Sequence, residues 1–227
     1  MSVGIRQASA RTRRFSAPPD LPSLALWLDA DDAATWDGTT WTDKSGQGNH
    51  VTHVAGVAPT RTGSQNSRTT MVMTGGRLAG SANLFGSAIS LYAAFVKVGS
   101  AATFEGHPFG LWTSNQFARY NAELWIGNVN TPSGWTNIKT QTTFCVLSII
   151  AADATNTATE WKDGTLVQSL TSFSGAWSAS TVSIGNRADA AVPFGGHVGE
   201  IIAYSVAHDA TERSAVESYL RTRWGTP

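Results

Sequence analysis

The chain has 227 residues, a length at which all-β sandwiches and barrels commonly form a single domain. Only 14% of the residues are charged and the formal net charge is zero, so no bulk field attracts nucleic acid or a membrane surface. The single cysteine, Cys145, excludes an internal disulfide and disfavours a disulfide-stapled module. No stretch reaches the ~18 apolar residues of a membrane span, and an apolar signal segment is lacking, so we expect no export by the usual route.

The first 20 residues are predicted to form a basic arm, and residues 21–227 a single domain. Four arginines and no acid occupy residues 1–14, whereas the rest of the chain has 12 basic and 16 acidic residues. Such like charges repel one another and keep a free segment extended, but they favour an acidic partner. The side chains predicted to anchor the arm to a larger assembly are Ile5, Arg6, Arg11, Arg13, Arg14 and Phe15.

Short segments of strand character, separated by turn residues, follow one another along the rest of the chain. The predicted strands cover residues 24–28, 88–98, 107–112, 117–120, 124–127, 142–151, 181–185 and 197–204. Between residues 160 and 167 we expect a hairpin with Asp163-Gly164 in a type I′ turn. Many short strands at this spacing are typical of a β-sandwich or barrel.

One segment, residues 209–224, has the spacing of an amphipathic helix instead. Asp209 and Glu212 form a capping-box pattern at its start, and Gly225 follows as a stop. The side chains expected on its buried face are Val216, Tyr219, Leu220 and Trp224.

Two parts of the sequence resemble a known family. Residues 26–32 (LWLDADD) lead to residues 41–50 (WTDKSGQGNH), and residues 183–185 (SIG) lead through 194–196 (FGG) to 199–204 (GEIIAY) and the helix. They are similar to the opening and closing elements of the laminin-G-like, concanavalin A-like jelly-roll family found in phage and bacterial proteins. The resemblance implies an all-β jelly-roll β-sandwich with one short C-terminal helix, in which the first and last strands pair. Because this fold hosts lectins, glucanases, adhesion modules and virion proteins, it does not decide the function.

Two polar segments, residues 29–32 and 43–49, can each be explained either as a structural turn or as a ligand site. In residues 43–49, Asp43 and Asn49 can bind nearby backbone N–H groups, and the glycines permit positive φ, which favours a turn over a ligand-binding loop. The carboxylates of Asp29, Asp31 and Asp32 are weak candidates for calcium ligands, but their spacing matches no self-sufficient calcium loop. No other metal site and no other cofactor are expected.

Catalytic patterns are missing from the sequence. Retaining glycosidases use two carboxylates about 5 Å apart, and jelly-roll glucanases carry theirs on one strand as E-x-D-x-x-E, which does not occur here. The five histidines form no H-E-x-x-H set, and neither G-x-S-x-G nor a phosphate-binding loop is present. We therefore expect a protein that is not an enzyme.

The nine tryptophans leave a binding function open. Trp27, Trp161 and Trp224 are predicted to belong to the core. Others lie beside Asn, Ser and Gly, where a ring could contact the apolar face of a sugar and amides its hydroxyl groups. The residues proposed on this basis for carbohydrate binding are Trp112, Asn115, Trp135 and Asn137.

Two hypotheses for the function follow. The leading one is a structural protein of a bacteriophage virion (decoration, minor capsid or tail-associated), made in the host cytoplasm and docked through its arm onto other virion proteins as part of an oligomer or assembly. The alternative is a carbohydrate-binding module, or a receptor-binding protein for a cell-surface glycan, located outside the cell or on its surface. Neither hypothesis involves a nucleic-acid or membrane partner.

Overall fold

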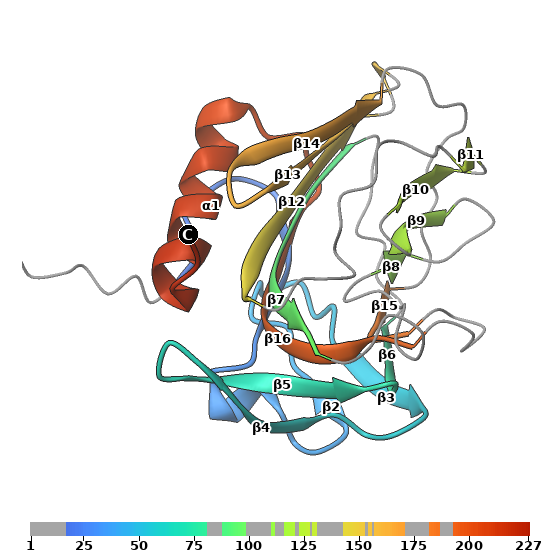
Figure 1. Cartoon of the computed structure of the whole chain (residues 1–227), viewed down its shortest axis with the longest axis vertical. Coiled ribbons are helices and arrows are strands. Elements are labelled where there is room, and N and C mark those ends of the chain that lie inside the picture. The colour runs from blue at the N-terminus through green and yellow to red at the C-terminus, as the bar shows by residue number, and fades with distance from the viewer. Residues whose placement is uncertain are drawn as a thin grey trace, which may run out of the picture.

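The computed structural model describes residues 17–80, 88–98, 110–111, 116–120, 123–127, 129–130, 143–152, 154–155, 157–170, 182–186 and 193–227. Two antiparallel sheets face each other, and one helix lies on the outer side of the first sheet (Figure 1). The predicted fold class, an all-β jelly-roll sandwich with one C-terminal helix, is confirmed. No helix in the described part of the chain is long and apolar enough to cross a membrane.

The first sheet has the strand order β14-β13-β12-β7-β16-β5-β4, with β1 also paired to β16. Residues 195–198 of β16 pair with β5, and residues 200–204 pair with β1, which confirms that the first and last strands are partners. The strands of this sheet are β1 (Leu24–Asp29), β4 (Thr60–Gln65), β5 (Arg68–Thr74), β7 (Ala88–Lys97), β12 (Cys145–Ala152), β13 (Thr157–Lys162), β14 (Thr165–Leu170) and β16 (Gly195–Tyr204).

The second sheet has the order β11-β10-β9-β8-β15-β6-β3-β2. Its strands are β2 (Thr40–Trp41), β3 (Val51–Ala55), β6 (Arg77–Gly80), β8 (Gly110–Leu111), β9 (Gln116–Tyr120), β10 (Glu123–Gly127), β11 (Val129–Asn130) and β15 (Val182–Ile184), and a 3-10 turn, η1 (Ala33–Thr35), follows β1. Each predicted strand has a counterpart, but no strand was predicted between residues 51 and 80, where β3 to β6 lie. One of them, β4, is an edge strand of exposed and half-buried residues, so it lacks the apolar signal of a core strand.

Two apolar clusters lie on opposite faces of the first sheet. Along β12, Leu147 and Ile149 point into the cluster between the sheets, whereas Val146 and Ile150 point toward the helix. Because both faces are covered, every residue of β12 except the last is buried, as its continuous apolar run predicts.

The C-terminal helix α1 (Ala210–Trp224) begins with the predicted capping box. Asp209 accepts hydrogen bonds from the first turn, and the Glu212 side chain accepts one from the backbone N–H of Asp209. Gly225 ends the helix with a left-handed φ of 65°. All four residues predicted for its buried face are buried, namely Val216, Tyr219, Leu220 and Trp224.

The predicted type I′ turn in the β13–β14 hairpin is also confirmed. Both central residues have positive φ, 49° at Asp163 and 80° at Gly164. The Asp163 carboxylate in addition accepts a hydrogen bond of 2.8 Å from the backbone N–H of Val146, which joins the turn to β12.

A bulge in β16 changes which face its side chains occupy. The register shifts between Val198 and Glu200, so Val198 and Ile201 both belong to the cluster between the sheets, while Glu200 faces the helix. At Gly199, an added Cβ would lie 2.7 Å from ring atoms of Trp224. Glycine therefore allows the indole to rest directly on the strand.

Candidate functional site

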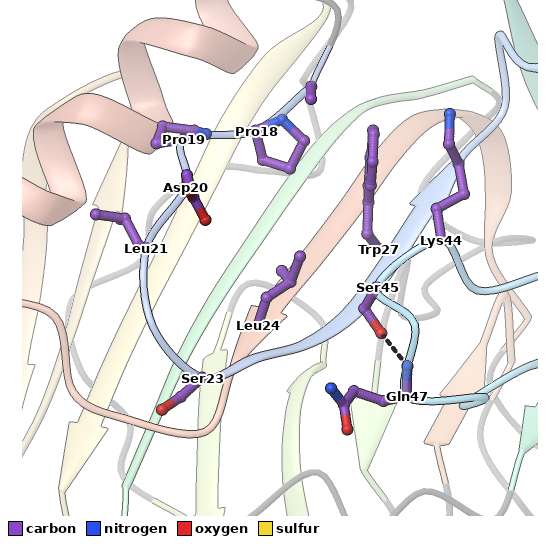
Figure 2. A pocket seen from close by; sticks show the side chains of 11 residues that line it. Pro18, Pro19, Asp20, Leu21, Ser23, Leu24, Trp27, Lys44, Ser45 and Gln47 are labelled. Atoms are coloured by element: carbon purple, nitrogen blue, oxygen red, sulfur yellow. Dashed lines mark hydrogen bonds between the residues drawn. The ribbon is translucent and has the colours of Figure 1, made fainter.

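A groove of about 490 Å³ lies on the side of the first sheet that carries α1 (Figure 2). One wall is the segment 17–24, and the other is the turn 44–47. Trp27 of β1 lies between these walls. The volume is within the roughly 300–1,000 Å³ of small-ligand pockets.

The turn wall is held by Asp43, which is buried. Its carboxylate accepts hydrogen bonds from the backbone N–H groups of Trp27, Ser45 and Asn49 at 2.9, 2.8 and 2.9 Å, and from the Ser45 hydroxyl at 2.7 Å. The Asn49 amide donates to the backbone carbonyl of Ala25 at 2.7 Å. The turn glycines with positive φ are Gly46 and Gly48. The structural explanation of residues 43–49 is thus confirmed, and the same turn presents Ser45 and Gln47 to the groove.

The opposite wall is attached to the end of β16. The Tyr204 hydroxyl donates to the carbonyl of Pro19 at 3.2 Å, and the backbone N–H of Ser205 donates to the carbonyl of Ser23 at 2.9 Å. Ser23 adopts a positive φ of 66°, which turns the chain into β1. Residues 17–20, the described end of the predicted arm, therefore lie against the domain.

The indole of Trp27 is fixed on one edge and one face. Its Nε1–H donates to Glu200 at 2.7 Å, and the Lys44 ammonium lies 4.2 Å from the ring centroid. Figure 2 shows the ring edge-on between Lys44 on one side and Pro18 and Leu24 on the other. The second face is thus turned toward the groove. An aromatic face held in this way is a platform on which an apolar ligand surface can stack.

Lys44 is engaged by two carboxylates. Its Nζ lies 2.8 Å from Asp32 and 3.1 Å from Asp29. Burial by itself lowers the pKa of Lys44, but the hydrogen bonds and charges of the two aspartates outweigh it, so the pKa is raised. The hydrogen bond from Lys44 is the main reason that the pKa of Asp32 is lowered.

Behind the groove, a buried polar cluster connects β1, β16 and α1. Glu200 is fully buried and accepts hydrogen bonds from the Tyr219 hydroxyl at 2.8 Å and the Trp224 indole at 3.0 Å. Arg223 lies 3.1 Å from Glu200 and 3.0 Å from Asp29. Burial, together with the charge of Asp29, raises the pKa of Glu200 to about 7, against the opposing effect of Arg223 and the hydrogen bonds.

This raised pKa predicts a pH dependence of stability. Because the folded protein holds the Glu200 proton more tightly than the unfolded chain, with its usual value of 4.5, this group contributes stability that is lost as the pH rises toward 7. We expect the unfolding free energy of the wild type, minus that of Glu200→Gln, to decrease between about pH 5 and pH 8, by on the order of 2 kcal/mol.

Urea unfolding of both proteins across this range measures the difference, in which titrating groups that do not interact with Glu200, such as His208, cancel. A difference that stays constant with pH contradicts the prediction.

The candidate calcium ligands are engaged with basic side chains instead. Asp31 lies 2.6 Å from Arg68 and also accepts the backbone N–H of Thr69, while Asp29 and Asp32 share Lys44. No group of three His, Cys, Asp or Glu side chains suited to a metal occurs among the residues that the structure describes. The calcium alternative therefore receives no support, and these carboxylates act as ion-pair partners.

The other predicted site residues lie outside the described residues. These are Trp112, Asn115, Trp135 and Asn137 of the proposed sugar site, and Ile5, Arg6, Arg11, Arg13, Arg14 and Phe15 of the arm. Both assignments stay predictions.

Of the three tryptophans assigned to the core, only Trp224 is fully buried. Trp27 and Trp161 are partly buried against the helix-side cluster. Sequence patterns did not indicate that Trp27 lines a groove; the one related signal was the ligand-loop alternative for residues 43–49, which form one wall.

Comparison with known proteins shows similarity at the level of structure. No protein-family model and no curated protein sequence matches the chain. Trypanosoma rangeli sialidase matches with a TM-score of 0.60 and 15% identity, covering 88% of this chain and 33% of the sialidase. The chain thus spans about a third of that enzyme.

Two further solved structures that match are single domains in complex with a ligand. Domain 4 of AbnA, a GH43 extracellular arabinanase from Geobacillus stearothermophilus, in complex with arabinotriose, matches with a TM-score of 0.60 and 15% identity, over 87% of this chain and 98% of that domain. The binding domain of botulinum neurotoxin DC in complex with SialylT matches with a TM-score of 0.59 and 10% identity, over 87% and 51%. At these identities the likeness shows the fold alone, a jelly-roll β-sandwich of two antiparallel sheets.

Proposed function

We propose that this domain is a non-catalytic carbohydrate-binding module with its ligand site in the Trp27 groove. The observation that carries the proposal is the indole face of the half-buried Trp27, which is turned toward the groove and held in place by Glu200 and Lys44 between a polar turn and a mainly apolar segment. Sugar sites use this combination, with a ring for the apolar face of the sugar and polar groups for its hydroxyls. Further support comes from the similarity to an isolated domain of nearly the same extent that was solved with arabinotriose.

The carboxylates near the groove support a binding role rather than hydrolysis. Glycosidases need two carboxylates that reach the scissile bond from the substrate cleft. Glu200 is fully buried and accepts three hydrogen bonds from side chains, and Asp29 and Asp32 are paired with Lys44. None of these three is placed to act as an acid or a nucleophile on a groove-bound sugar, and Asp20 is the single carboxylate among the residues that line the groove.

The similarities favour the carbohydrate-binding hypothesis over the virion hypothesis. None of the proteins named above is a phage protein, and the arm residues on which virion docking depends lie outside the described residues. The virion role and the location that it implies stay predictions.

Replacing Trp27 by alanine is expected to weaken saccharide binding by the full-length protein at least about 30-fold, because the stacking surface disappears. Isothermal titration calorimetry against soluble oligosaccharides, including arabinotriose, measures it. Trp161→Ala is the matched control, since Trp161 is also half-buried and lies under a cation, with Arg213 4.3 Å from its ring, but outside the groove.

Gln47→Ala separates binding from folding. Gln47 is exposed on the groove wall, so its loss is expected to weaken binding about 2–10-fold at unchanged thermal stability. If the wild type binds no saccharide of the panel, or if Trp27→Ala and Trp161→Ala bind equally well, the groove is not a sugar site.

A further inference from the structure

We infer that the groove selects uncharged saccharides and discriminates against acidic sugars such as uronates and sialosides. This inference rests on the proposed function and names the ligand class of the same site. The observation behind it is that the ammonium group of Lys44, the positive charge of the groove, is already bound by neighbouring side chains.

Lys44 is the single basic residue among those that line the groove, all of which the structure describes. An ammonium group has three N–H donors. In this lysine the ammonium contacts Asp32, Asp29 and the face of Trp27, at 2.8, 3.1 and 4.2 Å respectively. A ligand carboxylate would have to displace one of these partners, so Lys44 does not serve as a free anion receptor.

The one other charged residue that lines the groove is the acidic Asp20. Behind the groove, Asp29 and Asp32 are paired with Lys44 and Arg223, so these charges balance. On the opposite wall, Asp20 is exposed, and Figure 2 shows it across the groove from Lys44. An acidic sugar would lose hydration and meet like charge without gaining a cation, which is how a binding site rejects a competing ligand.

Uncharged groups supply the contacts that a neutral sugar needs. The exposed Gln47 amide offers donors and an acceptor, and Ser23 adds an exposed hydroxyl. Leu24 and the open face of Trp27 provide apolar surface between them. Because hydroxyl groups both donate and accept hydrogen bonds, such a lining matches a neutral saccharide.

The test uses pairs of probes that differ in charge. Calorimetry on the full-length protein compares trigalacturonate with its methyl ester and sialyllactose with its methyl ester, with arabinotriose as a neutral reference. We expect each acidic member to bind at least about tenfold more weakly than its neutral partner. Asp32→Asn, which keeps an Asx cap for η1 but removes one carboxylate from Lys44, is expected to improve acidic binding about threefold or more, in a salt-sensitive manner.

The outcomes separate the two proposals. If the acidic members bind the wild type as tightly as their neutral partners, and Trp27→Ala removes that binding, the groove binds sugars but the inferred selectivity is wrong. If Asp32→Asn leaves the preference unchanged, the engagement of Lys44 is not its cause, and the inference is likewise overturned. If no probe binds, the proposed function itself fails.

Discussion

Replacing Arg223 by leucine is expected to lower the unfolding free energy by about 3–5 kcal/mol, the range for breaking a buried ion pair from one side. The guanidinium is the basic group beside the buried Glu200 and also binds both oxygens of Asp29 at 3.0 Å. Leucine would leave these two carboxylates, which are almost wholly buried, with less compensating charge.

The loss is expected to be larger at about pH 8 than at about pH 5, because Arg223 opposes the upward shift of the Glu200 pKa. Without it, the folded protein binds this proton still more tightly, and stability decreases further as the pH rises. Chemical denaturation at both pH values measures the effect. Arg221→Leu, on the same helix and partly exposed, is the control and should lose much less. Equal losses in the two variants would contradict the central role of Arg223.

Replacing Asp43 by alanine is expected to cost about 3 kcal/mol of stability and to remove saccharide binding, since several donors lose their acceptor at once. Its carboxylate accepts four hydrogen bonds, three of them from backbone N–H groups: that of Trp27 joins the turn to β1, and those of Ser45 and Asn49 hold the turn itself. Without this acceptor, the wall that carries Ser45 and Gln47 no longer has a fixed position beside Trp27.

Asp43→Asn is expected to fall between the wild type and Asp43→Ala, because an amide retains one of the two acceptor oxygens. Asp37→Ala is the matched control. Asp37 also accepts two backbone N–H groups within a turn, but it is exposed and lies outside the groove, so its loss should leave binding intact. Thermal unfolding and calorimetry are measured for all four proteins. Full binding by Asp43→Ala would show that the turn does not form the site.

The position of Glu200 illustrates where sequence patterns stop being informative. In an uninterrupted strand, Glu200 would share a face with Val198 and point between the sheets. The bulge at Gly199 turns it toward the helix, where Trp27, Tyr219 and Trp224 donate to it. In the local sequence, only Gly199 marks the bulge. The reason for a glycine there is visible only in the tertiary structure, where the indole of Trp224 leaves no room for a Cβ atom.

The sequence by itself determined the elements in which the hydrogen-bond donor and acceptor are only a few residues apart along the chain. The capping box of α1, the Asp163-Gly164 turn and the Asp43 turn are of this kind, because their partners are close along the chain whatever the rest of the fold does. The tertiary structure alone decided the groove. Trp27 and Glu200 are 173 positions apart, and only the pairing of β1 with β16 brings the indole, its buried anchor and the walls of the groove together. Contacts between such distant residues depend on strand register and on a bulge, which local propensity does not encode.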